Sequence, residues 1–121
     1  RPMSVLFVEY PKCSTCQKAK KWLEERGVEF EDRHILEQNP TKEELKLWWE
    51  KSGLPLKRFF NTSGQKYREL QLKDRILTMS QEEQLELLST DGMLVKRPVL
   101  VGEDFVTTGF REKEWETLLG K

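Results

Sequence analysis

Two cysteines separated by two residues, set between a strand-like and a helix-like segment, constrain the fold of this chain more than any other feature. Cys13 and Cys16 follow residues 4–8 (SVLFV), an apolar run typical of a strand that is buried on both faces. The sequence after this run predicts a helix over residues 13–26 that ends at Gly27, a residue type favoured at helix C-termini. Both thiols are therefore predicted in the first turn of a helix that follows a buried strand.

The predicted helix gives the two cysteines different surroundings. Cys16, Ala19 and Leu23 recur at the spacing of one helical face, so we expect Cys16 to point into the core. Cys13 stands at the helix N-terminus, where the helix dipole and unpaired backbone N–H groups stabilise a thiolate. Lys12, just before it, either adds positive charge there or is merely solvated. We expect Cys13 to attack, and Cys16, with the higher pKa, to resolve the resulting mixed disulfide or adduct.

In the rest of the chain, strand patterns precede and follow a helical middle segment. Residues 28–33 alternate in polarity and complete a strand–helix–strand unit. Capping boxes at Thr41 and Ser80 predict two helix starts, and no strand pattern appears between Thr41 and Thr90. The remaining predictions are helix ends at Gly53 and at Asp91-Gly92, short helices and loops over residues 54–77, a hairpin of strands 99–101 and 105–108, and a helix over residues 112–119.

Arg97 and Pro98, just before the third predicted strand, are the second feature that suggests chemistry. A proline at this place favours a cis peptide that sets backbone beside the thiol, although a proline at the start of a strand is the simpler alternative. Arg97 would then direct a planar, permanently charged donor group toward an anion that approaches Cys13. A surface salt bridge is the alternative for Arg97.

Other roles for the cysteine pair fit the sequence less well. Zinc needs four ligands, and the chain has no second cysteine pair and a single imidazole, His34, which we expect to be structural or solvated. Haem attachment needs a histidine where Gln17 stands. We therefore predict no metal site. Two buried cysteines without a role remain a weaker alternative.

The composition limits the classes of partner that we expect this protein to bind. Lys plus Arg and Asp plus Glu both total 21, so no net charge attracts a polyanion, and direct nucleic-acid binding is not expected. No apolar run approaches the length of a membrane span, and the run after Met3 is interrupted by Glu9, unlike a secretory leader. We expect a cytoplasmic protein that contacts no membrane.

Four segments, taken in their order along the chain, resemble those of a known protein family. These are YPKCSTCQKAK from Tyr10, NTSG from Asn61, KRPV from Lys96 and VTTGFREKE from Val106. Together they are similar to the ArsC/Spx family over nearly the whole length. The resemblance implies an α/β fold, a thioredoxin-like (glutaredoxin-like) four-stranded mixed sheet with a helical insertion between the second and third strands. Residues 1–121 would form a single domain, with the insertion at approximately 41–92.

The resemblance also implies functions and site residues. The family contains glutaredoxin-dependent arsenate reductases and small thiol oxidoreductases, in which Cys13 matches the catalytic cysteine and Arg97 the arginine before the proline. Cys16 adds an internal resolving thiol. The substrate would lie against Lys12, Ser14, Thr15, Arg97 and Pro98. No bound cofactor is implied; glutathione with glutaredoxin, or thioredoxin, would supply electrons. The arsenate reductases have two further arginines. In this chain Asn61 stands at the position of the first, and Arg111 lies close to the position of the second, with uncertain register.

The same family includes Spx-type regulators, in which a Cys-x-x-Cys pair acts as a redox switch. These proteins bind the C-terminal domain of the RNA polymerase α subunit, and Gly53 lies near the glycine that they present to it. A helix C-cap explains Gly53 equally well. Our leading hypothesis is therefore a thiol oxidoreductase acting on arsenate, a disulfide or a mixed disulfide, with a redox-sensing regulator as the alternative.

Overall fold

Four strands form one mixed sheet in the computed structural model, which describes residues 4–121. Their order across the sheet is β2-β1-β3-β4. β1 pairs parallel with β2 and antiparallel with β3, and β3 pairs antiparallel with β4. This is the thioredoxin-like mixed sheet that the resemblance implied. The strands are β1 (Val5–Glu9), β2 (Phe30–His34), β3 (Val99–Val101) and β4 (Val106–Thr108).

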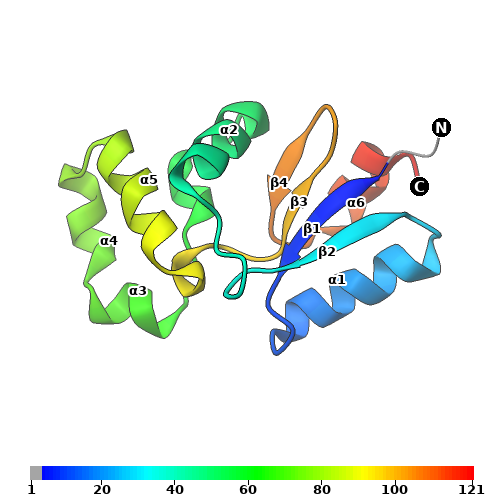
Figure 1. Cartoon of the computed structure of the whole chain (residues 1–121), viewed down its shortest axis with the longest axis horizontal. Helices are drawn as coiled ribbons and strands as arrows, with labels where there is room; N and C mark the ends of the chain where they lie inside the picture. Colours follow the sequence, from blue (N-terminus) through cyan, green and yellow to red (C-terminus); the bar gives the residue numbers. More distant parts are fainter. Residues whose placement is uncertain (1–3) are drawn as a thin grey trace.

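Helices cover both faces of the sheet (Figure 1). α1 and α6 lie on one face, and a helical segment between β2 and β3 lies on the other, with α2 packed against the sheet and α5 against α2. The helices are α1 (Ser14–Glu25), α2 (Lys42–Ser52), α3 (Gln65–Glu69), α4 (Leu72–Arg75), α5 (Gln81–Thr90) and α6 (Glu112–Leu119), with 3-10 turns at Leu56–Phe59, Ile76–Thr78 and Gly92–Leu94.

The side chains of β1 divide between two hydrophobic clusters. Val5 and Phe7 pack with Ala19 and Leu23 of α1 and with Trp115 of α6. Val8 points the opposite way, into the cluster that holds the α2 and α5 side chains. Because successive strand residues face opposite sides of a sheet, β1 is buried on both faces, as its apolar run predicts.

Both capping boxes are present. The Thr41 hydroxyl accepts a hydrogen bond from the Glu44 N–H at 3.1 Å, and the Ser80 hydroxyl accepts one from the Glu83 N–H at 3.1 Å. Gly53 ends α2 in the left-handed region, at φ +69°. The two long helices of the middle segment therefore begin and end where local sequence chemistry predicts.

Several predicted boundaries were wrong by one or two residues. β1 continues to Glu9, whose carbonyl accepts the Ile35 N–H at 2.8 Å. β2 begins only at Phe30, because the Val28 N–H bonds back to α1. β4 begins at Val106, and the Phe105 carbonyl accepts the Gly102 N–H at 2.8 Å in the turn before it.

The ends of α1 also differ from prediction by one residue. Cys13 is the N-cap of α1, so the helix itself begins at Ser14 and ends at Glu25. α5 ends where predicted, with Asp91 as its C-cap, and Asp91 also caps the next turn by accepting the Met93 N–H at 2.9 Å.

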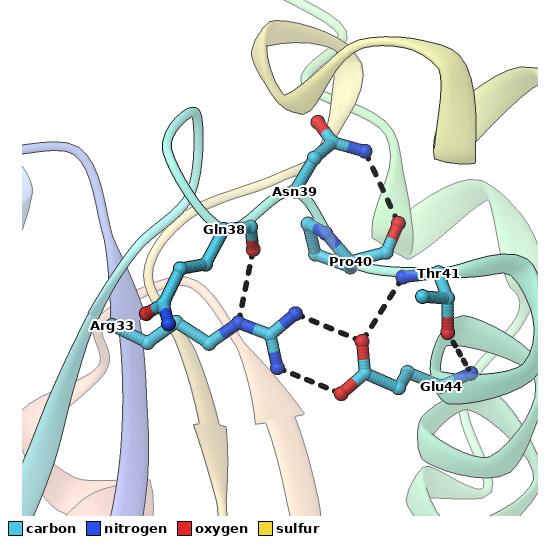
Figure 2. A network of polar contacts seen from close by, with 6 residues as sticks. All are labelled: Arg33, Gln38, Asn39, Pro40, Thr41 and Glu44. Atoms are coloured by element: carbon cyan, nitrogen blue, oxygen red, sulfur yellow. Dashed lines mark hydrogen bonds and ion pairs between the residues drawn. The ribbon is translucent and has the colours of Figure 1, made fainter.

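A bidentate ion pair fastens the helical segment to the sheet. Arg33 of β2 donates to both Glu44 carboxylate oxygens of α2, at 2.7 and 2.8 Å, and its Nε donates to the Gln38 carbonyl (Figure 2). The same carboxylate accepts the Thr41 N–H at the start of α2 (Figure 2). The paired guanidinium lowers the pKa of Glu44 to about 2. One carboxylate thus caps α2 and joins it to β2.

Among residues 4–121, no helix is both long enough and apolar enough to span a membrane.

Candidate active site

Cys13 occupies the N-cap position of α1, with extended backbone angles. A tight turn brings it there: the Cys13 N–H donates to the Tyr10 carbonyl at 2.9 Å, and the Gln17 N–H donates to the Cys13 carbonyl at 3.0 Å. The Gln17 side chain also donates to the Pro11 carbonyl and braces the loop. Cys13 is partly exposed, whereas Cys16 is buried.

The surroundings of Cys13 favour its thiolate. Partial burial acts to raise its pKa, but the Cys16 N–H and thiol, the positive charge of Arg97 and the Thr15 N–H outweigh burial and lower the pKa below its ordinary value. The Cys13 side chain makes no capping hydrogen bond of ordinary geometry, so the N–H groups act on the sulfur as nearby dipoles.

Cys16 has the opposite environment. It is fully buried, on the face of α1 that also carries Ala19, Trp22 and Leu23. Burial raises the pKa of its thiol to about 12, and the nearby Cys13 and Glu9 add to that increase, while the Tyr10 N–H opposes it. The expected asymmetry is therefore present: the surroundings lower the pKa of the Cys13 thiol and raise that of the Cys16 thiol.

Arg97 lies beside this pair, and the bond to Pro98 is cis, as expected. Its guanidinium carbon lies 5.3 Å from the centre of the Tyr10 ring. One terminal nitrogen donates to the Met93 carbonyl at 3.5 Å, and Nε is buried without a hydrogen-bond partner. The surface-salt-bridge alternative fails within the described residues, where Arg97 pairs with no carboxylate. Arg97 thus retains donors for an anion.

An open cavity of about 510 Å³ adjoins the motif and is strongly basic. Thr15 and Phe110 line it together with five cationic residues from three segments: Lys57, Arg58, Lys96, Arg97 and Arg111. None of these cations forms an ion pair within residues 4–121. Unpaired cations around a concave surface create a positive potential that attracts anions.

The structure brings some predicted site residues together and leaves others apart. Thr15 and Arg97 line the cavity, whereas exposed Lys12 and Ser14 do not. Lys12 is also absent from the groups that shift the pKa of Cys13. Pro98 is buried and uses its carbonyl to accept the Gly109 N–H at 2.8 Å, which shapes the cavity wall.

The cations at the cavity were largely missed from sequence. Lys57 and Arg58 lie on the 3-10 turn after α2. The Phe60–Val95 bridge, with hydrogen bonds from the Asn61 N–H to the Leu94 carbonyl and from the Lys96 N–H to the Phe59 carbonyl, draws that turn toward Arg97. The available signal was an adjacent Lys-Arg pair in a loop. Asn61 does not line this cavity, but Arg58 and Arg111 do.

His34 serves a local structural role. Its Nδ1 faces the backbone N–H groups of Leu36 and Glu37, at 3.1 and 3.3 Å, and its ring stacks edge-on against Tyr10. Across residues 4–121 the structure holds no cluster of three His, Cys, Asp or Glu side chains suited to a metal.

Comparisons with known proteins agree with this fold. Residues 8–118 match the model of the ArsC family. The chain is 61% identical to the uncharacterised protein YusI of Bacillus subtilis (strain 168), over 94% of this chain and 97% of YusI. It is 34% identical to the regulatory protein MgsR of the same strain, over 89% of this chain and 84% of MgsR. An ArsC family related protein from Bacteroides fragilis has a crystal structure that matches with a TM-score of 0.93 and 57% identity, over 98% of this chain and 99% of that chain. The chain belongs to the ArsC family.

Proposed function

We propose that this protein is a thiol oxidoreductase that reduces disulfides bearing acidic groups, with Cys13 as nucleophile and Cys16 as resolving thiol. The observation that carries the proposal is a thiol with a lowered pKa beside Arg97, next to a cavity lined by unpaired cations. A thiolate is the attacking species in disulfide exchange, and Arg97 holds negative charge where it is needed.

The reaction divides into two exchanges. The Cys13 thiolate attacks one sulfur of the substrate disulfide, the substrate S–S bond breaks, and one thiol leaves while a mixed disulfide forms on Cys13. Cys16 then attacks the Cys13 sulfur, releases the second thiol and leaves a Cys13–Cys16 disulfide. Two electrons pass to the substrate. An external thiol reductant, glutathione with glutaredoxin or thioredoxin, returns the protein to its dithiol form.

The size and charge of the cavity favour an acidic disulfide over a small oxyanion. Its volume of about 510 Å³ suits an organic ligand, and five cations exceed what one small anion can contact. Arsenate, the substrate of some family members, needs the same thiolate and remains the comparison substrate. Lys57 and Arg58 extend the positive charge beyond Arg97, where carboxylates of a peptide-sized thiol would lie.

A three-substrate assay tests the proposal. Glutathione disulfide, the uncharged bis(2-hydroxyethyl) disulfide and arsenate would be compared with wild type and with Cys13→Ser, using a matched reductant. We expect the highest kcat/KM for the acidic disulfide and no activity in Cys13→Ser. Equal activity in Cys13→Ser overturns the catalytic assignment, and a preference for arsenate or the uncharged disulfide overturns the substrate class.

One observation favours a second candidate function, a redox-switched regulator. MgsR, a relative with 34% identity, is named a regulatory protein. In this reading, oxidation of Cys13 and Cys16 would alter a surface that binds the C-terminal domain of the RNA polymerase α subunit, as the resemblance to Spx-type proteins implies. Gly53 is exposed at the end of α2 and lines a shallow cavity with Trp49 and Leu54.

A binding experiment separates this candidate from the enzyme. The isolated polymerase α C-terminal domain would be titrated with the oxidised and the reduced protein, and with Gly53→Arg in both states. Binding in one redox state that Gly53→Arg removes supports the regulator. No binding in either state overturns it.

A further inference from the structure

A buried carboxyl group lies directly behind the dithiol. Glu9, the last residue of β1, is 4% exposed. Val5 and Phe7 of the same strand face α1, so the alternation of strand side chains directs Glu9 to the α1 side as well. It lines an open cavity with Gln17 and Lys20 of α1. A carboxyl group thus occupies a position that an apolar residue would fill in an inert core.

Glu9 is the inner end of a row of polar side chains, Glu9, Asp32 and Lys20, that reaches the surface. Asp32 of β2 pairs with Phe7 in the parallel register, two residues before Glu9 on the same face, and the Glu9 and Asp32 side chains line the same open cavity. Asp32 in turn forms an ion pair with Lys20 at 2.8 Å. The Asp32 side chain is 34% exposed and that of Lys20 is 42% exposed.

Cys16 adjoins the inner end of this row. Cys16 lies one helical turn before Lys20 on α1, and Lys20 lines the same cavity as Glu9. The charge of Glu9 also raises the pKa of the Cys16 thiol. Exposure therefore rises stepwise from a fully buried Cys16 to a nearly buried Glu9 and a partly exposed Asp32. The sulfur of Cys16 has no comparable exit on the α1 side toward Ala19 and Leu23, which are fully buried and apolar.

We propose that Glu9 and Asp32 form a proton path that accepts the Cys16 proton during the resolving step and passes it to solvent. This inference rests on the proposed function, because only a resolving thiol needs to lose its proton. Cys13 has less need of the path, because its surroundings lower the pKa of its thiol.

The resolving step moves one proton and exchanges one disulfide bond for another. Cys16 gives its proton to the Glu9–Asp32 pair, and its thiolate attacks the Cys13 sulfur of the mixed disulfide. The Cys13–Cys16 bond forms, the bond from Cys13 to the substrate sulfur breaks, and the substrate thiolate leaves with the electron pair. Asp32 releases the proton to solvent, where the departing thiolate takes up a proton.

The charges around Glu9 suit this role. Burial, and then the hydrogen bond and negative charge of Asp32, raise the pKa of Glu9 to about 7, while Lys20 opposes the increase. α1 presents Cys16 and Lys20 to Glu9, β2 presents Asp32 with His34 beyond it, and β3 is entirely apolar. A carboxyl group that titrates near neutral pH exchanges protons in both directions at working pH.

A single-turnover experiment isolates the resolving step. Thionitrobenzoate would be attached to Cys13 as a mixed disulfide, and its release by Cys16 followed by absorbance from pH 5 to 9, in wild type and Glu9→Gln. Glu31→Gln is the matched control, because Glu31 is the exposed neighbour of Asp32 on the opposite face of β2. Cys16→Ser gives the background.

The expected result is slower release in Glu9→Gln by at least about tenfold at pH 7, the low side of general-base contributions. The rate should recover with rising pH as hydroxide replaces the carboxylate, and Glu31→Gln should match wild type. Glu9→Asp should restore part of the rate. Unchanged release in a folded Glu9→Gln protein, or a loss that does not vary with pH, overturns the proton path.

Two further readouts keep this test distinct from the proposed function. Failure of Cys13 to form the mixed disulfide at all contradicts the proposed function and not the path. If Glu9→Gln does not fold, Asp32→Asn at the exposed end is measured instead, with the same expected pH-dependent slowing. A normal rate in folded Asp32→Asn then overturns the path.

Discussion

The two sides of the dithiol differ in charge, although only one helical turn separates the cysteines. Thr15, between the two cysteines, lines a cavity with Lys57, Arg58 and other cations, whereas Gln17, directly after Cys16, lines a second cavity with Glu9 and Asp32. Although partial burial opposes the change, the Cys16 N–H and thiol, the charge of Arg97 and the Thr15 N–H lower the pKa of Cys13, while burial is the main cause that raises the pKa of Cys16. Two cysteines one helical turn apart thus acquire different pKa values, and Arg97 is the one contributor distant from the motif in sequence.

The largest expected effect comes from removing either thiol. Cys13→Ser should reduce disulfide reduction to the background rate. Cys16→Ser should still attack the substrate but stop at the mixed disulfide, which mass spectrometry of the intact protein would detect. Accumulation of a mixed disulfide on Cys16 in the Cys13→Ser protein would reverse the assignment of the two roles.

Removing the charge of Arg97 tests the cationic side. Arg97→Met should raise the pKa of Cys13, because an adjacent positive charge stabilises a thiolate. At pH 7 the alkylation rate of Cys13 would fall by up to about tenfold. Arg111→Met is the matched control, since Arg111 lines the cavity but is not among the groups that shift this pKa. Equal effects of the two variants would show that general charge, and not Arg97, sets the pKa.

Removing the charge of Lys57 or Arg58 should have a smaller effect, a change in KM that depends on the substrate. Lys57→Ala and Arg58→Ala are each expected to raise KM for an acidic disulfide about twofold to fivefold, the range for partly solvated ion pairs. KM for an uncharged disulfide should stay constant. Lys73→Ala makes the same charge change on α4, away from the cavity, and should leave both values unchanged. A similar increase for both substrates would contradict a role in recognising carboxylates.

The Arg33–Glu44 pair lies apart from both regions and should affect stability alone. Because pairing lowers the pKa of Glu44 to about 2, its contribution is present above its unfolded pKa and is lost as pH falls toward 2. Glu44→Gln should destabilise the protein by about 1 kcal/mol at pH 7, after discounting for solvent exposure, and by much less near pH 2. Urea unfolding at the two pH values measures the difference; a pH-independent loss would assign it to packing.

Local sequence patterns predicted much of the fold. The capping boxes at Thr41 and Ser80, the apolar run of β1 and the stripe through Cys16 each depend on neighbouring residues, so short-range chemistry sufficed. Strand ends were less predictable. Whether residue 28 joins β2 depends on its hydrogen bond back to α1, which the alternation of side chains does not reveal.

Only the cysteine pair and the arginine beside it were predictable from sequence. Cys13, Cys16 and Arg97 have local or familial signatures, whereas Lys57 and Arg58 reach the cavity through a bridge to residue 95 that no periodicity indicates. Glu9 appears in sequence as an interruption of an apolar run. The signal for its role was its two-residue spacing from Val5 and Phe7, which places a carboxylate on a buried face.

The unequal reactivity of the two thiols is the central claim, and alkylation against pH tests it most directly. The reduced wild-type protein would be treated briefly with iodoacetamide across a pH series, and the modified cysteine identified by peptide mass spectrometry. We predict that Cys13 alone reacts, with a midpoint below about 8.5, the value of an unperturbed thiol. Reaction of Cys16 at the same midpoint, or before Cys13, would contradict the account.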